Sequence, residues 1–112
     1  MTRYAWCVDE HANDELLTVC KALANPTRLL IMGWLRDPAD HFERQADPIE
    51  DVGVCVKQIQ EKAGISQSTA SQFMSILQRA GLVTSRRIGP WTYYQRDDQH
   101  VARLPELLQS RL

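Results

Sequence analysis

The sequence predicts a mainly α-helical fold with one β-hairpin, and three observations support this. Apolar residues recur at helical spacing over much of the chain. Two short helical segments meet at Gly64. Directly after them, two β-rich runs, LVTSRR and WTYYQR, flank the turn IGP, which is the pattern of a hairpin. Two helices joined by a turn and followed by a hairpin make a winged helix-turn-helix, whose second helix enters the major groove of DNA.

The first helix is expected over about residues 13–24, after an N-terminal arm formed by residues 1–12. Leu16, Cys20 and Leu23 recur at helical spacing, so they should form its apolar stripe. Cys20 is therefore expected on the face that packs against the rest of the protein.

The second helix is expected from Pro26 to about Arg36, with Asn25 as its N-cap and the proline at the first helical position. It is apolar over much of its surface and should lie in the core. Residues 37–52 then form a long acidic connection, in which six acids oppose one arginine. Such a long connection is unusual in a small protein and is often functional. Phe42 and Ile49 could attach it to the core.

The helix-turn-helix is expected over residues 54–80. Its first helix should run from about Val54 to Ala63, with Gly64 as the left-handed residue that ends it. Ser66 is the expected N-cap of the second helix. That helix should turn three apolar residues toward the core at i, i+4 and i+7, namely Ala70, Met74 and Leu77.

The hairpin, or wing, is expected over residues 82–96, with Gly89 at positive φ in its turn. A last helix is expected over residues 98–112, beginning at Asp97 or Asp98. Pro105 should kink or restart that helix. Together these elements make one expected domain, residues 1–112.

The stretch GISQSTASQFM, residues 64–74, carries mostly small or amide polar side chains on a helix. Glutamine can pair with adenine edges, while serine and threonine can reach bases or phosphates. Arginines on a wing can contact phosphates or enter a narrow minor groove. The candidate DNA-contacting residues are Gln67, Ser68, Thr69, Ser71, Gln72, Arg86 and Arg87. A polar face that meets only water is the simpler alternative.

Charge is strongly segregated along the chain, although the net charge is only −1. Residues 57–96 hold six basic residues and a single acid, Glu61. A basic half that contains the polar helix favours a nucleic-acid partner over a solvated surface alone.

Three segments together resemble the ArsR/SmtB family of metal- and stress-responsive bacterial repressors. They are KALANPTRLLIMGWL (21–35), ISQSTASQFMSILQRAGLV (65–83) and SRRIGPWTYYQRD (85–97). The resemblance implies a homodimer built on the first and last helices, which represses a promoter until an inducer binds. The last helix is also too apolar for a small monomer to leave wet. The candidate dimer residues are Leu16, Leu104, Leu107 and Leu108.

In the family's arsenic sensors, the helix before the recognition helix begins with Cys-Val-Cys. Here VCVKQI keeps Cys55 and has Lys57 in place of the second cysteine. The resemblance thus makes Cys55 the first candidate sensor, with Cys7 and Cys20 as the other thiols for arsenite or for a soft metal ion such as zinc, cadmium or lead. Cys7 and His11 are four residues apart, so they would share one face if the N-terminal arm is helical, and with Cys55 they could form a site for zinc, cadmium or lead. Oxidation of a thiol near a cation is another route, and a buried core role for Cys55 is an equal alternative.

The residue patterns do not predict an enzyme, because the sequence has no paired-carboxylate site, no Ser/His/Asp arrangement and no glycine-rich phosphate loop. No cofactor is required. No apolar run reaches the roughly 18 residues of a membrane span, and the start of the chain lacks a signal peptide, so a cytoplasmic location is expected. The predicted function is a homodimeric repressor that binds double-stranded operator DNA. The alternative is a winged-helix module that binds another protein and no DNA.

Overall fold

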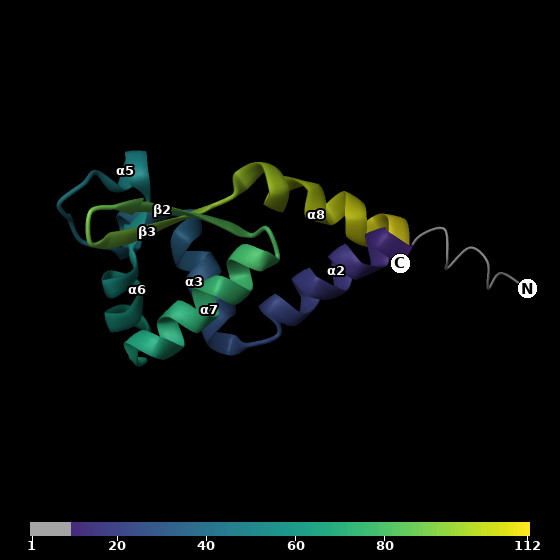
Figure 1. Cartoon of the computed structure of the whole chain (residues 1–112). Coiled ribbons are helices and arrows are strands. Elements are labelled where there is room, and N and C mark those ends of the chain that lie inside the picture. The colour runs from purple at the N-terminus through teal and green to yellow at the C-terminus, as the bar shows by residue number, and fades with distance from the viewer. Residues whose placement is uncertain (1–9) are drawn as a thin grey trace, which may run out of the picture.

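The computed structural model describes the backbone of residues 10–112 and the side chains from residue 14 onward. The chain folds as a winged helix-turn-helix, in which helices pack against one small antiparallel sheet (Figure 1). Its elements are α2 (Glu10–Leu23), α3 (Pro26–Arg36), α4 (Pro38–His41), α5 (Ile49–Val52), β1 (Val54–Cys55), α6 (Val56–Ala63), α7 (Gln67–Arg79), β2 (Val83–Ile88), β3 (Trp91–Arg96) and α8 (Asp98–Arg111). None of the helices in this described part is long and apolar enough to cross a membrane.

The core lies where α3, α6 and α7 meet the sheet, and its centre is fully buried. Ile31 of α3, Ile59 of α6 and Met74 of α7 have no exposed surface. The start of α3 is capped as predicted, since the Asn25 side chain accepts hydrogen bonds from the backbone N–H groups of Thr27 and Arg28 at 2.9 and 3.0 Å. Packing of these apolar faces therefore fixes which side of α7 points outward.

The sheet has one strand more than predicted. Val54 and Cys55, expected as the first turn of a helix, form the edge strand β1 and pair with Tyr94 and Tyr93 of β3. The strand order is β1-β3-β2. Gly53, at φ +92°, ends α5 in a conformation that no helix continues, so the chain enters the sheet before α6 begins. The predicted helix start at Val54 was therefore wrong: Val54 and Cys55 form a strand, and the helix begins at Val56.

Helix α2 differs from its prediction at its start and in its facing. The described part of α2 already includes Glu10, so residues 10–12 of the predicted arm are helical. Val19 and Ala22 are its buried residues, whereas Cys20 is exposed. The face of α2 that meets α3 and α7 is rotated away from Cys20, and the prediction that Cys20 lies in a buried stripe was wrong for the single chain.

The acidic connection is attached to the protein at several points. It contains the short helices α4 and α5, and Phe42 and Ile49 are each only 8% exposed, which confirms their predicted attachment. Phe42 meets the ring of Trp34 edge to face, with 6.3 Å between ring centroids. Gln45 accepts a hydrogen bond from the N–H of Cys55 at 3.0 Å. The connection thus forms a fixed layer beside β1 and α6.

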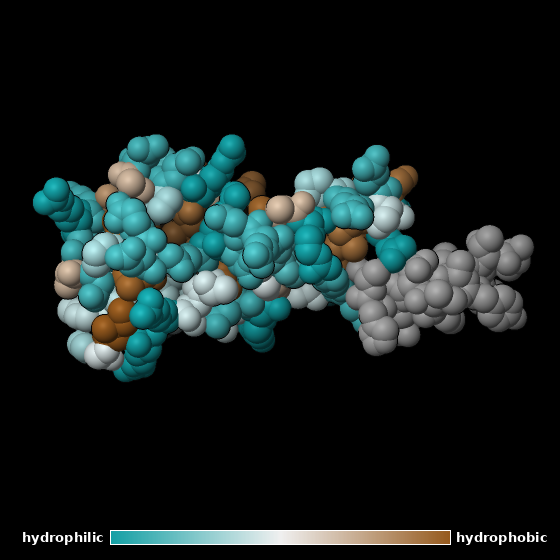
Figure 2. Space-filling model, turned by 90° about the horizontal axis from the view of Figure 1, so that it is seen from above, coloured by the Kyte–Doolittle hydropathy of each residue, from teal (hydrophilic) through white to brown (hydrophobic). Residues whose placement is uncertain are grey.

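Helix α8 lies beside α2, and the two project together from the core (Figure 1). Of the two predicted effects of Pro105, a kink or a restart, the restart does not occur, because α8 continues through the proline to Arg111. Leu104 and Leu107 are half-buried, and Leu108 is 40% exposed. In the view of Figure 2, apolar side chains reach the surface in separate small groups among hydrophilic ones.

Candidate nucleic-acid interface

The outward face of α7 carries most of the residues predicted to contact DNA. Gln67, Ser68, Ser71 and Gln72 are all exposed, while the opposite face of the helix is buried in the core. The buried face holds the helix in place and leaves a row of short hydrogen-bonding groups on the surface. Such groups can donate to and accept from base edges once a groove approaches them.

Thr69 differs from its predicted neighbours. It is half-buried, and its Oγ1 lies 2.8 Å from the Oγ of Ser66, whose own oxygen accepts a hydrogen bond from the Thr69 N–H at 3.1 Å. The Ser68 Oγ also contacts Ser66, at 3.2 Å from the Ser66 Oγ. Thr69 therefore takes part in the helix cap, whereas Ser68 also contacts Ser66 but stays exposed.

The two wing arginines, Arg86 and Arg87, are exposed neighbours on β2. Successive side chains of a strand point to opposite faces, so only one of them can face α7. Arg87 is that residue, because it lines the hollow between the wing and the helix. The turn beyond it is closed by Gly89 at φ +59°, as predicted.

This hollow, called the wing groove below, has a volume of about 610 Å³ and lies between α6, α7 and the wing. The residues whose chemistry matters for its role are Lys57, Gln60, Gln67, Ser71, Arg87 and Trp91. Its described lining contains two cations and no carboxylate. A polar, positively charged groove beside a polar helix suits a nucleic-acid backbone.

Three residues of the wing groove were missed by the sequence reasoning. Lys57 was counted in the basic half and considered as the replacement of a cysteine and as a cation near Cys55, but it was not predicted to contact DNA, and Gln60 and Trp91 were assigned no role. Trp91, the first residue of β3, is 42% exposed. The available signal was that Lys57 and Gln60 are three residues apart on one short helix and therefore share a face.

Cys55 lies at the junction of β1 and α6 and is 7% exposed. It packs with Val52 and Tyr93. The hydroxyl of Tyr93 donates to Asp47 of the acidic connection at 2.8 Å, and burial together with this hydrogen bond raises the pKa of Tyr93 to about 12. The strand β1 is thus held between β3 and the acidic connection.

A smaller hollow of about 270 Å³ lies beside Cys55, under the acidic connection. Glu43, Gln45, Gln58, Tyr93 and Cys55 line it, and so do Lys57 and Trp91. Lys57 and Trp91 also line the wing groove, so these two side chains form a wall that the two hollows share.

The described residues do not bring the candidate thiols together. Cys20 and Cys55 are both free, the first exposed on α2 and the second buried before α6. Cys7 lies outside the described residues, as does the side chain of His11. Within the described part of the chain, no three His, Cys, Asp or Glu side chains form a group that could hold a metal ion. Those residues alone do not fit a three-ligand metal or metalloid site.

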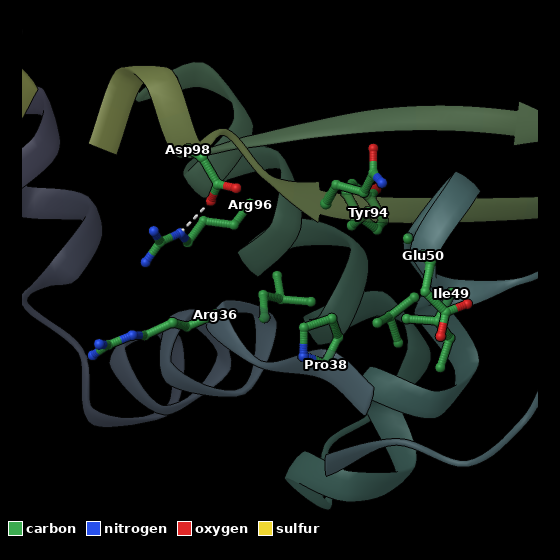
Figure 3. Close-up of a pocket in the computed structure, with 11 residues that line it drawn as sticks. Arg36, Pro38, Ile49, Glu50, Tyr94, Arg96 and Asp98 are labelled. Carbon is green, nitrogen blue, oxygen red and sulfur yellow. Dashed lines mark hydrogen bonds and ion pairs between the residues drawn. The ribbon is translucent and has the colours of Figure 1, made fainter. Parts of the chain in front are cut away.

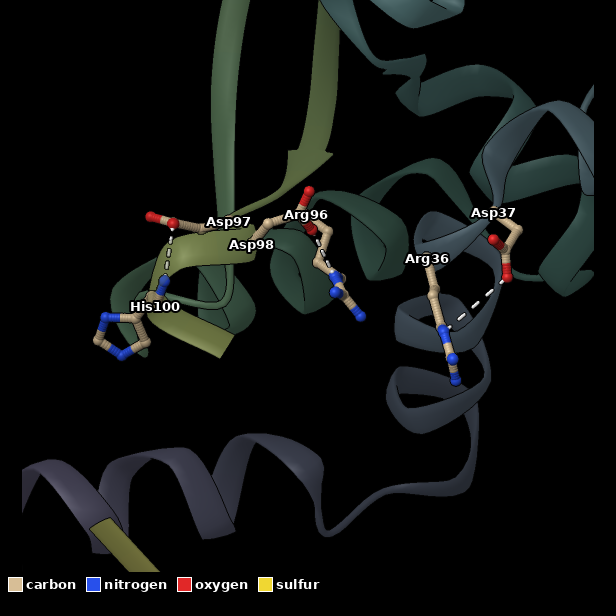
Figure 4. A network of polar contacts seen from close by, with 6 residues as sticks. All are labelled: Arg36, Asp37, Arg96, Asp97, Asp98 and His100. Carbon is tan, nitrogen blue, oxygen red and sulfur yellow. Dashed lines mark hydrogen bonds and ion pairs between the residues drawn. The ribbon is translucent and has the colours of Figure 1, made fainter. Parts of the chain in front are cut away.

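The candidate dimer residues lie on the two helices that project from the core. Leu16 on α2 is half-buried, and Leu17 beside it is 53% exposed. The helices are also joined by Glu15, whose Oε1 lies 3.7 Å from the Nε2 of His100 and 3.8 Å from the Nη2 of Arg103. Figure 4 shows the start of α8, where Asp97 accepts the N–H of His100 at 3.0 Å as its N-cap.

A further hollow of about 280 Å³, between α3, α5 and β3, is unlike the wing groove (Figure 3). Its lining mixes cations with acids, since Arg36 and Arg96 stand with Glu50 and Asp98. Arg96 is already paired with Asp98 at 2.7 Å. This balance of charge gives it no preference for a polyanion.

Comparison with known families and proteins agrees with this geometry. The family model described as "Bacterial regulatory protein, arsR family" matches residues 54–85, which are β1, the helix-turn-helix and the start of the wing. An uncharacterised HTH-type transcriptional regulator of Bacillus subtilis, YbzH, is 43% identical over 99 residues, covering 88% of this chain and 99% of the relative. The putative arsenical resistance operon repressor ArsR2 of Halobacterium salinarum is 36% identical over 88 residues, covering 79% of this chain and 64% of the relative.

Solved structures show the same fold. The homodimeric winged helix-turn-helix DNA-binding domain of Mb0332 from Mycobacterium bovis, a possible ArsR-family transcriptional regulator, aligns with a TM-score of 0.65 at 32% identity and covers 91% of this chain and 82% of that one. HlyU from Vibrio cholerae aligns with a TM-score of 0.60 at 26% identity and covers 88% of this chain and 91% of that one.

Proposed function

Because the chain belongs to the ArsR family of bacterial regulatory proteins, we propose that it is a homodimeric repressor released from its operator by a thiol-directed signal. It is a DNA-binding transcriptional regulator and not an enzyme. The observation that carries the proposal is the position of Cys55. It precedes α6, and α6 leads directly into the helix that presents Gln67 to Gln72.

The DNA-binding part of the proposal rests on the exposed polar row of α7 beside the wing groove. The row supplies base-reading groups, and Lys57 and Arg87 supply positive charge without a neighbouring acid in the groove lining. Phosphate contacts orient a protein on the duplex, and base contacts select the sequence. Gln67 and Gln72 are proposed as base contacts, and Ser68, Ser71, Thr69, Arg86 and Arg87 complete the proposed DNA-binding set.

The dimer is proposed through α2 and α8. The Mycobacterium bovis neighbour is homodimeric, and this chain has leucines exposed on both of its projecting helices. A two-fold arrangement would pair the same leucines with their mates and cover them. Two recognition helices would then read two half-sites about one helical turn apart.

The signal is proposed to act on Cys55, as arsenite, a soft metal ion or an oxidant. The Halobacterium salinarum relative is named as a putative arsenical resistance operon repressor, and thiolates are the ligands that soft metals prefer. Since the described residues supply one buried thiol at this place, a second ligand would come from Cys20 or Cys7. A group bound at Cys55 would press on the wall of Lys57 and Trp91 and so disturb the wing groove.

Cys55→Ser is expected to bind DNA like wild type but to resist release from the DNA by thiol-directed reagents. An inducer can only act by its different affinity for the free and DNA-bound forms, and a coupling of about 1–3 kcal/mol is typical. The assay is fluorescence anisotropy of a duplex that the wild-type protein selects from a random pool, with arsenite, cadmium or peroxide added. Cys20→Ser tests the second ligand: if this variant also resists release, Cys20 is the partner thiol, and if it is released like wild type, Cys20 is not required.

Two results would contradict this proposal in different ways. If Cys55→Ser is released as readily as wild type by every reagent, Cys55 is a core residue and the signal acts elsewhere. If wild type selects no duplex at all, the DNA-binding proposal fails, and that result favours the alternative of a protein-binding module. Release that occurs under reducing, peroxide-free conditions would indicate ligation rather than oxidation.

A further inference from the structure

A second basic hollow lies on the side of α7 away from the wing. It has a volume of about 340 Å³ and lies between α2, α3 and α7. We call it the inner groove, and its lining is Thr18, Lys21, Ala22, Arg28, Ile76 and Arg79. None of these residues was assigned to DNA binding by the sequence, and none belongs to the wing groove.

The inner groove gathers three cations and, within its described lining, no carboxylate. Arg28 is fixed in place, because its Nε donates to the Ala22 carbonyl at 2.6 Å, its Nη2 to the Lys21 carbonyl at 3.1 Å, and its guanidinium lies 5.1 Å from the ring centre of Phe73. Lys21 and Arg79 are exposed and have no ion-pair partner among the described residues. Like charges held together repel one another, so an anion in this groove is favoured.

The position of the inner groove follows from the geometry of α7. At 3.6 residues per turn, Ser68, Gln72 and Ser75 lie along the middle of the exposed face of α7. Gln67 and Ser71, at one edge of that face, line the wing groove. Ile76, at the other edge, lines the inner groove, and Arg79 lies at the end of the exposed face. The exposed face of α7 is therefore flanked on each side by a basic groove whose described lining has no acid.

We propose that the inner groove holds the phosphate backbone of one DNA strand, contacted by Lys21 and Arg79, while the wing groove receives the other strand. A major groove about 12 Å wide is filled by one helix about 10–12 Å across, so the two backbones must pass on either side of it. This inference rests on the proposed DNA-binding function and adds a second phosphate site to it. Arg28 is held in the wall of the groove by its three contacts. Lys21 and Arg79 are therefore the cations whose side chains can move to contact a phosphate.

The test compares Lys21→Gln, Arg79→Gln and the double variant with wild type. The probes are the duplex that wild type selects from a random pool and an unrelated duplex of the same length. For each variant, the logarithm of the association constant for DNA is plotted against the logarithm of the salt concentration. The slope should become shallower by about 0.9 in each single variant and by about twice that in the double variant. Affinity should fall equally for both duplexes, because phosphate contacts carry no sequence information. Lys62→Gln is the matched control, since Lys62 on α6 lies 5.1 Å from the ring centre of Trp34, outside both grooves.

The outcomes separate this inference from the function it rests on. If the double variant keeps the wild-type slope and affinity while wild type binds in a salt-dependent way, the inner groove does not contact DNA. If the double variant loses preference for the selected duplex at an unchanged slope, the two residues act on base reading and the inference is equally wrong. If wild type shows no salt-dependent binding to either duplex, the DNA-binding function itself fails and the inference falls with it.

Discussion

Replacing Leu108 by Asp is expected to leave a folded monomer that no longer binds the operator. Leu108 is 40% exposed in the single chain, so the change should not disturb the core. In the proposed dimer, the new carboxylate would be buried beside its two-fold mate. This should raise the dimer Kd by roughly a hundredfold or more, which is a loss of about 3 kcal/mol in the free energy of dimerisation. A monomer also loses the roughly 10²–10⁴-fold gain of binding two half-sites at once.

Sedimentation velocity measures the loss of the dimer, and fluorescence anisotropy of the labelled operator duplex measures the loss of DNA binding on the same sample. Gln109→Asp is the matched control, since it adds the same charge at an exposed polar position of the same helix. It should remain a dimer and bind the operator. A Leu108→Asp protein that is still dimeric at micromolar concentration would place the dimer contact elsewhere.

Gly53→Ala is expected to destabilise the protein by roughly 2–5 kcal/mol, adding the cost of a left-handed backbone to that of overpacking. Gly53 has φ +92°, and a Cβ there would overlap the backbone carbonyl of Tyr94 on β3. The strand that carries Cys55 follows directly, so its close approach to β3 depends on a residue without a side chain. The change should therefore loosen both the fold and the thiol site.

Thermal unfolding followed by circular dichroism measures the expected loss. Gly33→Ala is the matched control, because nothing lies within 4 Å of a Cβ built at Gly33 in α3, and alanine is favoured over glycine in a helix by about 1 kcal/mol. It should be neutral or slightly stabilising. An unchanged midpoint for Gly53→Ala would mean that β1 is not held against β3 as described.

The elements that could be predicted from sequence are those with a local signal. Ser66 and Asn25 mark helix starts by their side-chain caps, and the i, i+4, i+7 spacing of Ala70, Met74 and Leu77 identifies the buried face of α7. The exposed row of glutamines and serines follows from that facing. These features depend on neighbours within one or two turns, and all of them are present in the fold.

The features that were missed depend on contacts between distant parts of the chain. The strand β1 is only two residues long, too short for any periodicity, and its partner in β3 lies about forty positions further on. Cys20 was predicted on the wrong face because the residues of α2 that are buried where it packs against α3 and α7 are Val19 and Ala22. The sequence shows that Lys57 and Gln60 share a face of α6, but that face becomes part of the wing groove only because the hairpin folds back beside α6. The local pattern of α6 does not predict that contact.

The most direct test of the central claim, that the exposed row of α7 reads DNA, is the specificity of Gln67→Ala and Gln72→Ala. For each variant, anisotropy would measure affinity for the selected duplex and for single-base changes within it. The account predicts a loss of about 1–3 kcal/mol on the selected duplex, relaxed preference at one position, and an unchanged salt slope. Wild-type affinity and wild-type base preference in both variants would contradict it.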